Sequence, residues 1–82
     1  MFKENDRVMI NCKEVSKNEE LAFVCSKICD GYEVVLLMDH KPGSTHDPVR
    51  SFVTSEMRIA TQEEIDIAMT KWENKNNYKL RR

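Results

Sequence analysis

The feature that most constrains the fold is the Asp30-Gly31 pair, which lies between two apolar runs. Such a pair is typical of a tight β-hairpin, because glycine tolerates the positive φ that hairpin turns demand. Residues 32–38 (YEVVLLM) are apolar on both faces of an extended chain, so we expect a central strand there. Residues 21–28 fit a strand or one helix face equally well by periodicity, and their β-branched and aromatic content favours the strand.

Three further short extended segments surround this hairpin. They are residues 7–13, 49–53 and 58–60. The polar loops between them are residues 14–20 (EVSKNEE) and 39–48, the second interrupted by proline and glycine. We therefore expect a mainly β domain of five antiparallel strands with one C-terminal α-helix. If residues 18–29 are helical instead, the order becomes βαββα and the fold is α+β.

The helix is expected over residues 62–76. Thr61 and Glu64 form a capping-box sequence, in which each side chain satisfies the other residue's backbone N–H. The helix carries one apolar stripe, formed by Ile65, Ala68, Met69 and Trp72. We expect this stripe to cover an open end of the sheet, with Ile67 on the opposite side. The chain then divides into a sheet domain (1–61), a helix packed on it (62–76) and a basic tail (77–82).

Three segments resemble an SH3-like small barrel of the KOW type. They are Asp6-Arg7-Val8, residues 30–36 (DGYEVVL) and residues 53–61 (VTSEMRIAT). The resemblance covers about residues 2–61 and implies an SH3-like five-stranded antiparallel barrel. Such barrels rarely catalyse, and they dock nucleic acid or protein through loops and one sheet face. Compact examples with a helical tail are also typical of phage-encoded accessory proteins.

The length and composition of the chain restrict where the protein can reside and what it can bind. At 82 residues, a chain buries only about two-thirds of its unfolded surface, which leaves little room for a cofactor or a small-molecule substrate. No apolar run approaches the roughly 20 residues of a membrane helix, and the N-terminus lacks a signal peptide, so a cytoplasmic protein without a membrane partner is expected. Cys12, Cys25 and Cys29 are odd in number and lie in apolar patterns, which favours buried free thiols over disulfides.

Two patterns bear on chemistry. The spacing of Cys25, Cys29, His40 and His46 lies near that of a zinc finger. Proline and glycine separate the histidines, and the cysteines lie on a presumed strand, so we expect no metal. The carboxylate pairs at 19–20 and 63–64 fall in polar positions, which makes them solvated rather than catalytic. A metal-dependent or enzymatic role around Cys29, His40 and His46 stays as a third hypothesis.

The distribution of charge identifies the candidate contact surface. Residues 1–69 carry 8 basic and 13 acidic side chains, whereas residues 70–82 carry 5 and 1. The residues expected to contact a partner are Arg50, Ile67, Lys71, Lys75, Tyr78, Lys79, Arg81 and Arg82. Lysine and arginine beside aromatic rings suit phosphate contact and base stacking. Apolar Ile67 and Tyr78, with Leu80, also suit a docking or homodimer edge.

These observations lead to one principal function and one alternative. The principal function is a non-enzymatic binding module that docks a macromolecular partner, either nucleic-acid-processing machinery or nucleic acid itself through the basic tail. The alternative is a small protein-binding inhibitor or modulator of a host enzyme. That alternative uses an acidic surface formed by Asp30, Glu33, Asp39 and Asp47.

Overall fold

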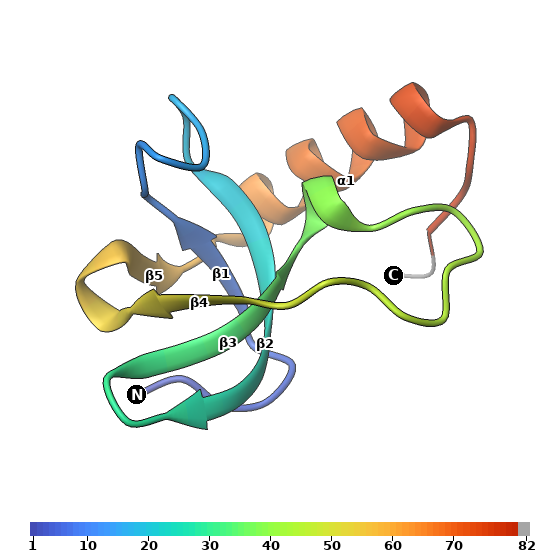
Figure 1. Cartoon of the computed structure of the whole chain (residues 1–82). Coiled ribbons are helices and arrows are strands. Elements are labelled where there is room, and N and C mark those ends of the chain that lie inside the picture. The colour runs from blue at the N-terminus through green and yellow to red at the C-terminus, as the bar shows by residue number, and fades with distance from the viewer. Residues whose placement is uncertain (81–82) are drawn as a thin grey trace.

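The computed structural model describes residues 1–80, which form one antiparallel sheet of five strands and one α-helix (Figure 1). The elements are β1 (Arg7–Ile10), β2 (Glu20–Ile28), β3 (Gly31–Leu36), the 3-10 turn η1 (Leu37–Asp39), β4 (Arg50–Val53), the 3-10 turn η2 (Thr54–Glu56), β5 (Met57–Ile59) and α1 (Gln62–Asn76). The strand order is β4-β3-β2-β1-β5, so the two edge strands are consecutive in the chain and joined only by η2. The expected mainly β fold with one C-terminal helix is confirmed.

The ambiguous segment 21–28 is a strand. β2 pairs antiparallel with both β1 and β3, so the helical alternative and the βαββα order are wrong. Leu21 belongs to the core beneath the helix, whereas Ala22 and Val24 belong to the core on the other side of the sheet. Because β2 is covered on both faces, its apolar residues do not alternate cleanly, which explains why the pattern also fitted a helix.

The hairpin between β2 and β3 forms where the sequence predicts it, but Gly31 is needed for another reason. Ile28 pairs with Gly31, so the turn consists of Cys29 and Asp30. Among residues 1–80 a positive φ occurs at Asn5, Gly43 and Asn77, and not at Gly31. A β-carbon on Gly31 would collide with the backbone carbonyl of Phe52 in β4. Glycine therefore allows the close approach of two strands.

Several strand boundaries differ from the prediction. The strand expected over 7–13 ends at Ile10, after which the N–H of Asn11 donates to the carbonyl of Glu56 at 2.7 Å. The strand expected over 32–38 ends at Leu36, because the chain turns into η1. Met38 is consequently half-exposed, at 50%. The end of β1 thus involves a contact with a distant segment, which periodicity does not register.

Two apolar clusters lie on opposite faces of β1 and β2. One gathers residues from all five strands, including Val8, Ile10 and Tyr32. The other joins Met9 and Leu21 to the helix and η1. The helix therefore packs on a face of the sheet, and the expectation that it covers an open end is corrected. Alternation along β1 accounts for this, because Met9 points away from its two neighbours.

The predicted capping box begins α1. The Thr61 hydroxyl accepts from the backbone N–H of Glu64 at 3.2 Å, and Glu64 Oε1 accepts from the N–H of Thr61 at 2.9 Å. Ile65, Met69 and Trp72 are buried against the sheet. The helix ends at Asn76 and is followed by the C-cap Asn77, whose left-handed backbone (φ 51°) is a common terminating conformation.

Candidate functional site

A groove of about 450 Å³ lies between α1 and the loop that leads into β2. Its floor is apolar and is formed by Met9, Leu21, Leu37 and Trp72. One wall is α1, and the other comprises Asn18, Glu19 and Glu20. Met38 of η1 also lines the groove. A concave surface with an apolar floor and polar walls is the usual form of a binding site.

Three of the predicted contact residues meet on the helix wall. Ile67, Lys71 and Lys75 all line the groove. They follow one another at intervals of four residues, which places them along one edge of the helix. Ile67, which was expected on the side opposite the buried stripe, thus borders the groove. Ile67 is 49% exposed although it is apolar. Sequence analysis identified these side chains but missed Met38 and the acidic wall, because these reach the groove only through tertiary packing.

The acidic side chains of the groove are paired within the protein. Arg58 of β5 donates to Glu19 at 2.7 and 3.0 Å and to Glu64 at 2.8 Å. The hydrogen bond from Arg58, with one from the Thr61 backbone, lowers the pKa of Glu64 to about 2, and the two carboxylates raise the pKa of Arg58. Glu20 accepts from a serine hydroxyl at 2.8 Å. The carboxylates of this wall are thus held in place by hydrogen bonds, and the single charge of Arg58 offsets one of their three negative charges.

The lysines of the groove are not paired in this way. Lys71 and Lys75 are exposed, and neither forms an ion pair with any residue of the described range 1–80. A ligand in the groove thus meets two unpaired ammonium groups on one wall and, on the other, carboxylates that are hydrogen-bonded within the protein. Glu19, Glu20 and Glu64 line the groove as well as the two lysines, and with Arg58 beside them the formal charges sum to zero.

A hydrogen-bonded loop closes the end of the groove near His40. The indole N–H of Trp72 donates to the His40 carbonyl at 3.1 Å, and the two rings stack with centroids 5.1 Å apart. His40 Nδ1 lies 2.7 Å from a carboxylate oxygen of Asp47. Burial would raise the pKa of Asp47, but the interaction with His40 and the hydrogen bonds from Ser44 and the Lys41 backbone together hold this pKa below its usual value. These contacts fasten the 40–47 loop to the helix.

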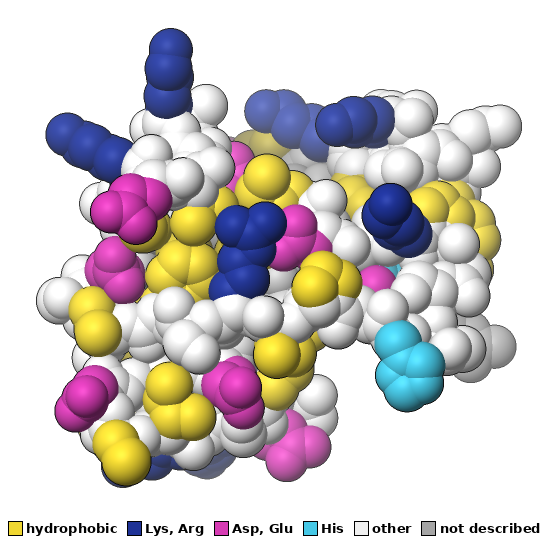
Figure 2. Space-filling view, in the orientation of Figure 1, with side chains coloured by type: hydrophobic (Ala, Val, Ile, Leu, Met, Phe, Trp, Pro, Cys, Tyr) yellow, Lys and Arg dark blue, Asp and Glu magenta, His cyan; other side chains and the backbone are white. Residues whose placement is uncertain are grey.

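The predicted acidic surface does not form one unpaired patch. Arg50 holds Asp39 in a bidentate pair at 2.8 and 3.1 Å, so one predicted basic contact neutralises one predicted acidic contact. Asp47 is bonded to the loop histidine, and Glu33 accepts from a serine hydroxyl at 2.9 Å. Asp30 is exposed at the hairpin turn. Figure 2 shows acidic, basic and apolar side chains interspersed over the sheet face, whereas basic groups project over α1 and the first loop.

The segment after the helix folds back toward it. Tyr78, 44% exposed, packs edge to face on Trp72, with ring centroids 5.9 Å apart. The N–H of Leu80 donates to Glu73 at 2.8 Å, and Leu80 packs against the helix cluster. Lys79 is exposed. The predicted contacts Arg81 and Arg82 lie outside the described residues.

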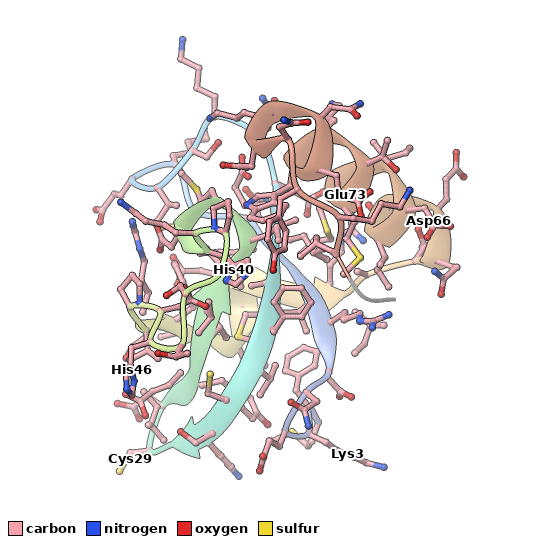
Figure 3. The ribbon with its side chains drawn as sticks, turned by 90° about the vertical axis from the view of Figure 1, so that its right-hand side faces the viewer. Lys3, Cys29, His40, His46, Asp66 and Glu73 are labelled. Atoms are coloured by element: carbon pink, nitrogen blue, oxygen red, sulfur yellow. The ribbon has the colours of Figure 1, made fainter. Side chains whose placement is uncertain are left out.

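The cysteines and histidines are dispersed. All three cysteines are free thiols, but Cys29 is exposed and the other two are half-buried, which corrects the expectation that all are buried. Figure 3 shows Cys29 at the hairpin tip, far from His40, with His46 on the outside of its loop. No group of three or more His, Cys, Asp or Glu side chains in residues 1–80 is placed to hold a metal ion.

Comparisons of the chain with protein-family models, with curated proteins and with solved structures find no match. Within residues 1–80, α1 is neither long enough nor apolar enough to cross a membrane. The functional conclusion therefore depends on the geometry of the groove.

Proposed function

We propose that this protein is a non-enzymatic binding module that docks a partner protein in the groove beside α1. One observation carries the proposal: the groove combines an apolar floor with two exposed lysines that have no partner in residues 1–80. The strand order, with η2 joining the two edge strands, supports an SH3-like small barrel as the architecture that presents this groove.

The same geometry favours a protein over nucleic acid as the occupant. Base stacking needs exposed aromatic rings, but Trp72 is 6% exposed and lies in the floor. The wall opposite the lysines carries Glu19 and Glu20, which a polyphosphate backbone would have to approach. Nucleic acid is thus the competing occupant for the experiment to test.

The acidic-surface alternative has weaker support. Two of its four residues, Asp39 and Asp47, are bonded to Arg50 and His40 within the protein. A contact that depends on them would have to break these pairs, which offsets part of the electrostatic gain. The groove lysines require no such exchange.

Site-specific photo-crosslinking tests the proposal, because the chain offers two matched positions. Ile67 lines the groove and is 49% exposed, whereas Ile59 of β5 lies outside it and is 55% exposed. Each is replaced in turn by a benzophenone amino acid, and the chain is irradiated in a lysate of its native source, with and without nuclease. We expect a discrete protein adduct from position 67, resistant to nuclease, and none from position 59. Equal adducts from both positions, or no adduct from position 67, would refute the docking function, and a nuclease-sensitive adduct would replace protein by nucleic acid.

A further inference from the structure

The chain folds back after α1 to form a short strap, residues 77–80 (Figure 1). Asn77 has a left-handed backbone, with φ at 51°, which turns the chain away from the helix axis. The N–H of Tyr78 then donates to the carbonyl of Glu73 at 3.2 Å, and the N–H of Leu80 donates to the Glu73 carboxylate at 2.8 Å. Both hydrogen bonds therefore tie the strap to one residue near the end of α1.

The strap covers apolar surface on the helix side of the sheet. Tyr78, which stays 44% exposed, packs edge to face on Trp72, and Leu80 packs against the cluster that joins the helix to β2. Within residues 1–80, no hydrogen bond joins the strap to the sheet or to the loop at residues 40–47. Over the described range, side-chain packing therefore holds the strap against the sheet.

The packing beside Leu80 is incomplete. A hollow of about 320 Å³ lies next to this side chain, and it is also lined by Phe23 and Val35, which pair across β2 and β3, and by His40 and Asp47. Leu80 leaves the hollow unfilled, so the closed strap lacks part of the dispersion contacts that a close-packed segment makes. Segments with few buried apolar contacts open locally at a low free energy while the rest of the protein stays folded. The strap therefore has the features of a segment that opens locally.

Trp72 connects the strap to the groove beside α1. Its ring lines the groove and stacks on His40, while Tyr78 of the strap packs on its edge. Leu37 and His40 line both the groove and the hollow beside the strap. Movement of the strap thus changes the packing of side chains that also form the groove.

We propose that residues 77–80 are a hinged strap, which opens about Asn77 while the sheet and α1 stay folded. When the strap is closed, it holds Trp72 in the floor of the groove. This inference goes beyond the proposed docking function, because it concerns a motion of the chain itself and stands whether or not a partner binds the groove.

Amide hydrogen exchange followed by NMR tests this inference on the full chain, because it measures local opening residue by residue. The readout is the backbone amide of Tyr78. Leu80→Ala removes the side chain that anchors the strap, whereas the control Lys79→Ala changes an exposed side chain of the same segment. Acrylamide quenching of Trp72, the single tryptophan of the chain, gives a second readout.

In the wild-type chain we expect the Tyr78 amide to be protected from exchange, but at least tenfold less than the amides inside β2. Low concentrations of urea should accelerate exchange in β2 but hardly change it at Tyr78, because opening of four residues exposes little surface. Leu80→Ala should lower the protection of Tyr78 at least fivefold and increase the quenching of Trp72. Lys79→Ala should leave both readouts as in the wild type.

Three results would overturn the inference. If Tyr78 exchanges as slowly as β2 and with the same dependence on urea, the strap unfolds only with the whole domain. If the Tyr78 amide is unprotected in the wild-type chain, the strap does not close. If Leu80→Ala leaves the quenching of Trp72 unchanged, the strap does not hold the floor of the groove. The wild-type measurements decide the first two points even if Leu80→Ala fails to fold.

Discussion

Replacement of Gly31 by alanine is the sharpest test of how the sheet is assembled. A β-carbon at this position would collide with the carbonyl oxygen of Phe52 and lie 2.9 Å from both the Phe52 carbonyl carbon and the Val53 Cα. Carbon atoms in ordinary contact lie about 3.5–4.0 Å apart. The obstruction is backbone, which no change of rotamer relieves, so β4 must move away from β3 by more than roughly 1 Å.

The energetic consequence follows from that displacement. A hydrogen bond of ordinary length stretched by about 1 Å no longer meets the geometric criterion for one. Loss of two such bonds near the Gly31–Val53 pair costs about 2 kcal/mol at roughly 1 kcal/mol each, and overpacking adds about 1–3 kcal/mol. The expected loss is ~3–5 kcal/mol, a large part of the 5–15 kcal/mol that stabilises a typical domain. A loss of 1 kcal/mol lowers the midpoint of thermal unfolding by about 4–8 °C for a domain of this size, so this midpoint should fall by about 12 °C or more.

Thermal and urea unfolding followed by circular dichroism measure this loss, and the second glycine of the chain supplies the control. Gly43 has a φ of 74° and no atom within 4 Å of an added β-carbon. Gly43→Ala should therefore cost only about 1 kcal/mol of left-handed backbone strain, and Gly43→Asn less, because asparagine tolerates that region. If Gly31→Ala destabilises no more than Gly43→Ala, or if asparagine is well tolerated at position 31, close strand approach is not the role of Gly31.

Three further changes test the helix and its contacts. Thr61→Ala removes the hydroxyl of the capping box and should lower the free energy of unfolding by about 1 kcal/mol in urea titrations. Trp72→Phe keeps a ring in the floor of the groove but leaves the His40 carbonyl without its donor. It should lower the free energy of unfolding by about 1–3 kcal/mol, whereas Trp72→Ala should lower it by about 3–5 kcal/mol. Glu64→Gln preserves the capping geometry but removes the charge. Folding lowers the pKa of Glu64 from 4.5 to about 2. The ionised Glu64 therefore contributes to the free energy of unfolding above pH 4.5, and this contribution is lost as the pH falls to about 2. The stability difference between wild type and Glu64→Gln should therefore shrink across that pH window, and a constant difference would contradict the Arg58 pairing.

Elements encoded by local signals were predictable. The capping box at Thr61 fixed the start of α1, and the stripe ending at Trp72 identified its buried face, because both depend on residues within four positions of each other. The hairpin was also predicted from a local signal, although its turn consists of residues 29–30 and not of the expected Asp30-Gly31 pair. The strand nature of β2 followed from composition even though its two covered faces obscured the alternation.

Features that depend on distant partners were not predictable. Arg58 joins Glu19 across 39 positions, and Gly31 is needed because Phe52 approaches it. No window of neighbouring residues contains either pair. Only the helix wall of the groove could be predicted, because Lys71 and Lys75 stand out in the sequence. The facing wall could not, because the pairing of β1 with β2 and β5 brings it into place.

Net charge along the sequence is accordingly a poor guide to what a partner encounters. The division into an acidic body and a basic tail follows chain order, but the fold places Lys71 and Lys75 on one wall of a groove whose other wall carries Glu19 and Glu20. At physiological salt the Debye length is about 8 Å, so a ligand in the groove responds mainly to charges on its two walls and little to carboxylates on the far side of the sheet. Within that radius Lys71, Lys75 and Arg58 balance the three carboxylates of Glu19, Glu20 and Glu64. A ligand in the groove therefore meets balanced charges on two separate walls rather than the acidic surplus of residues 1–69.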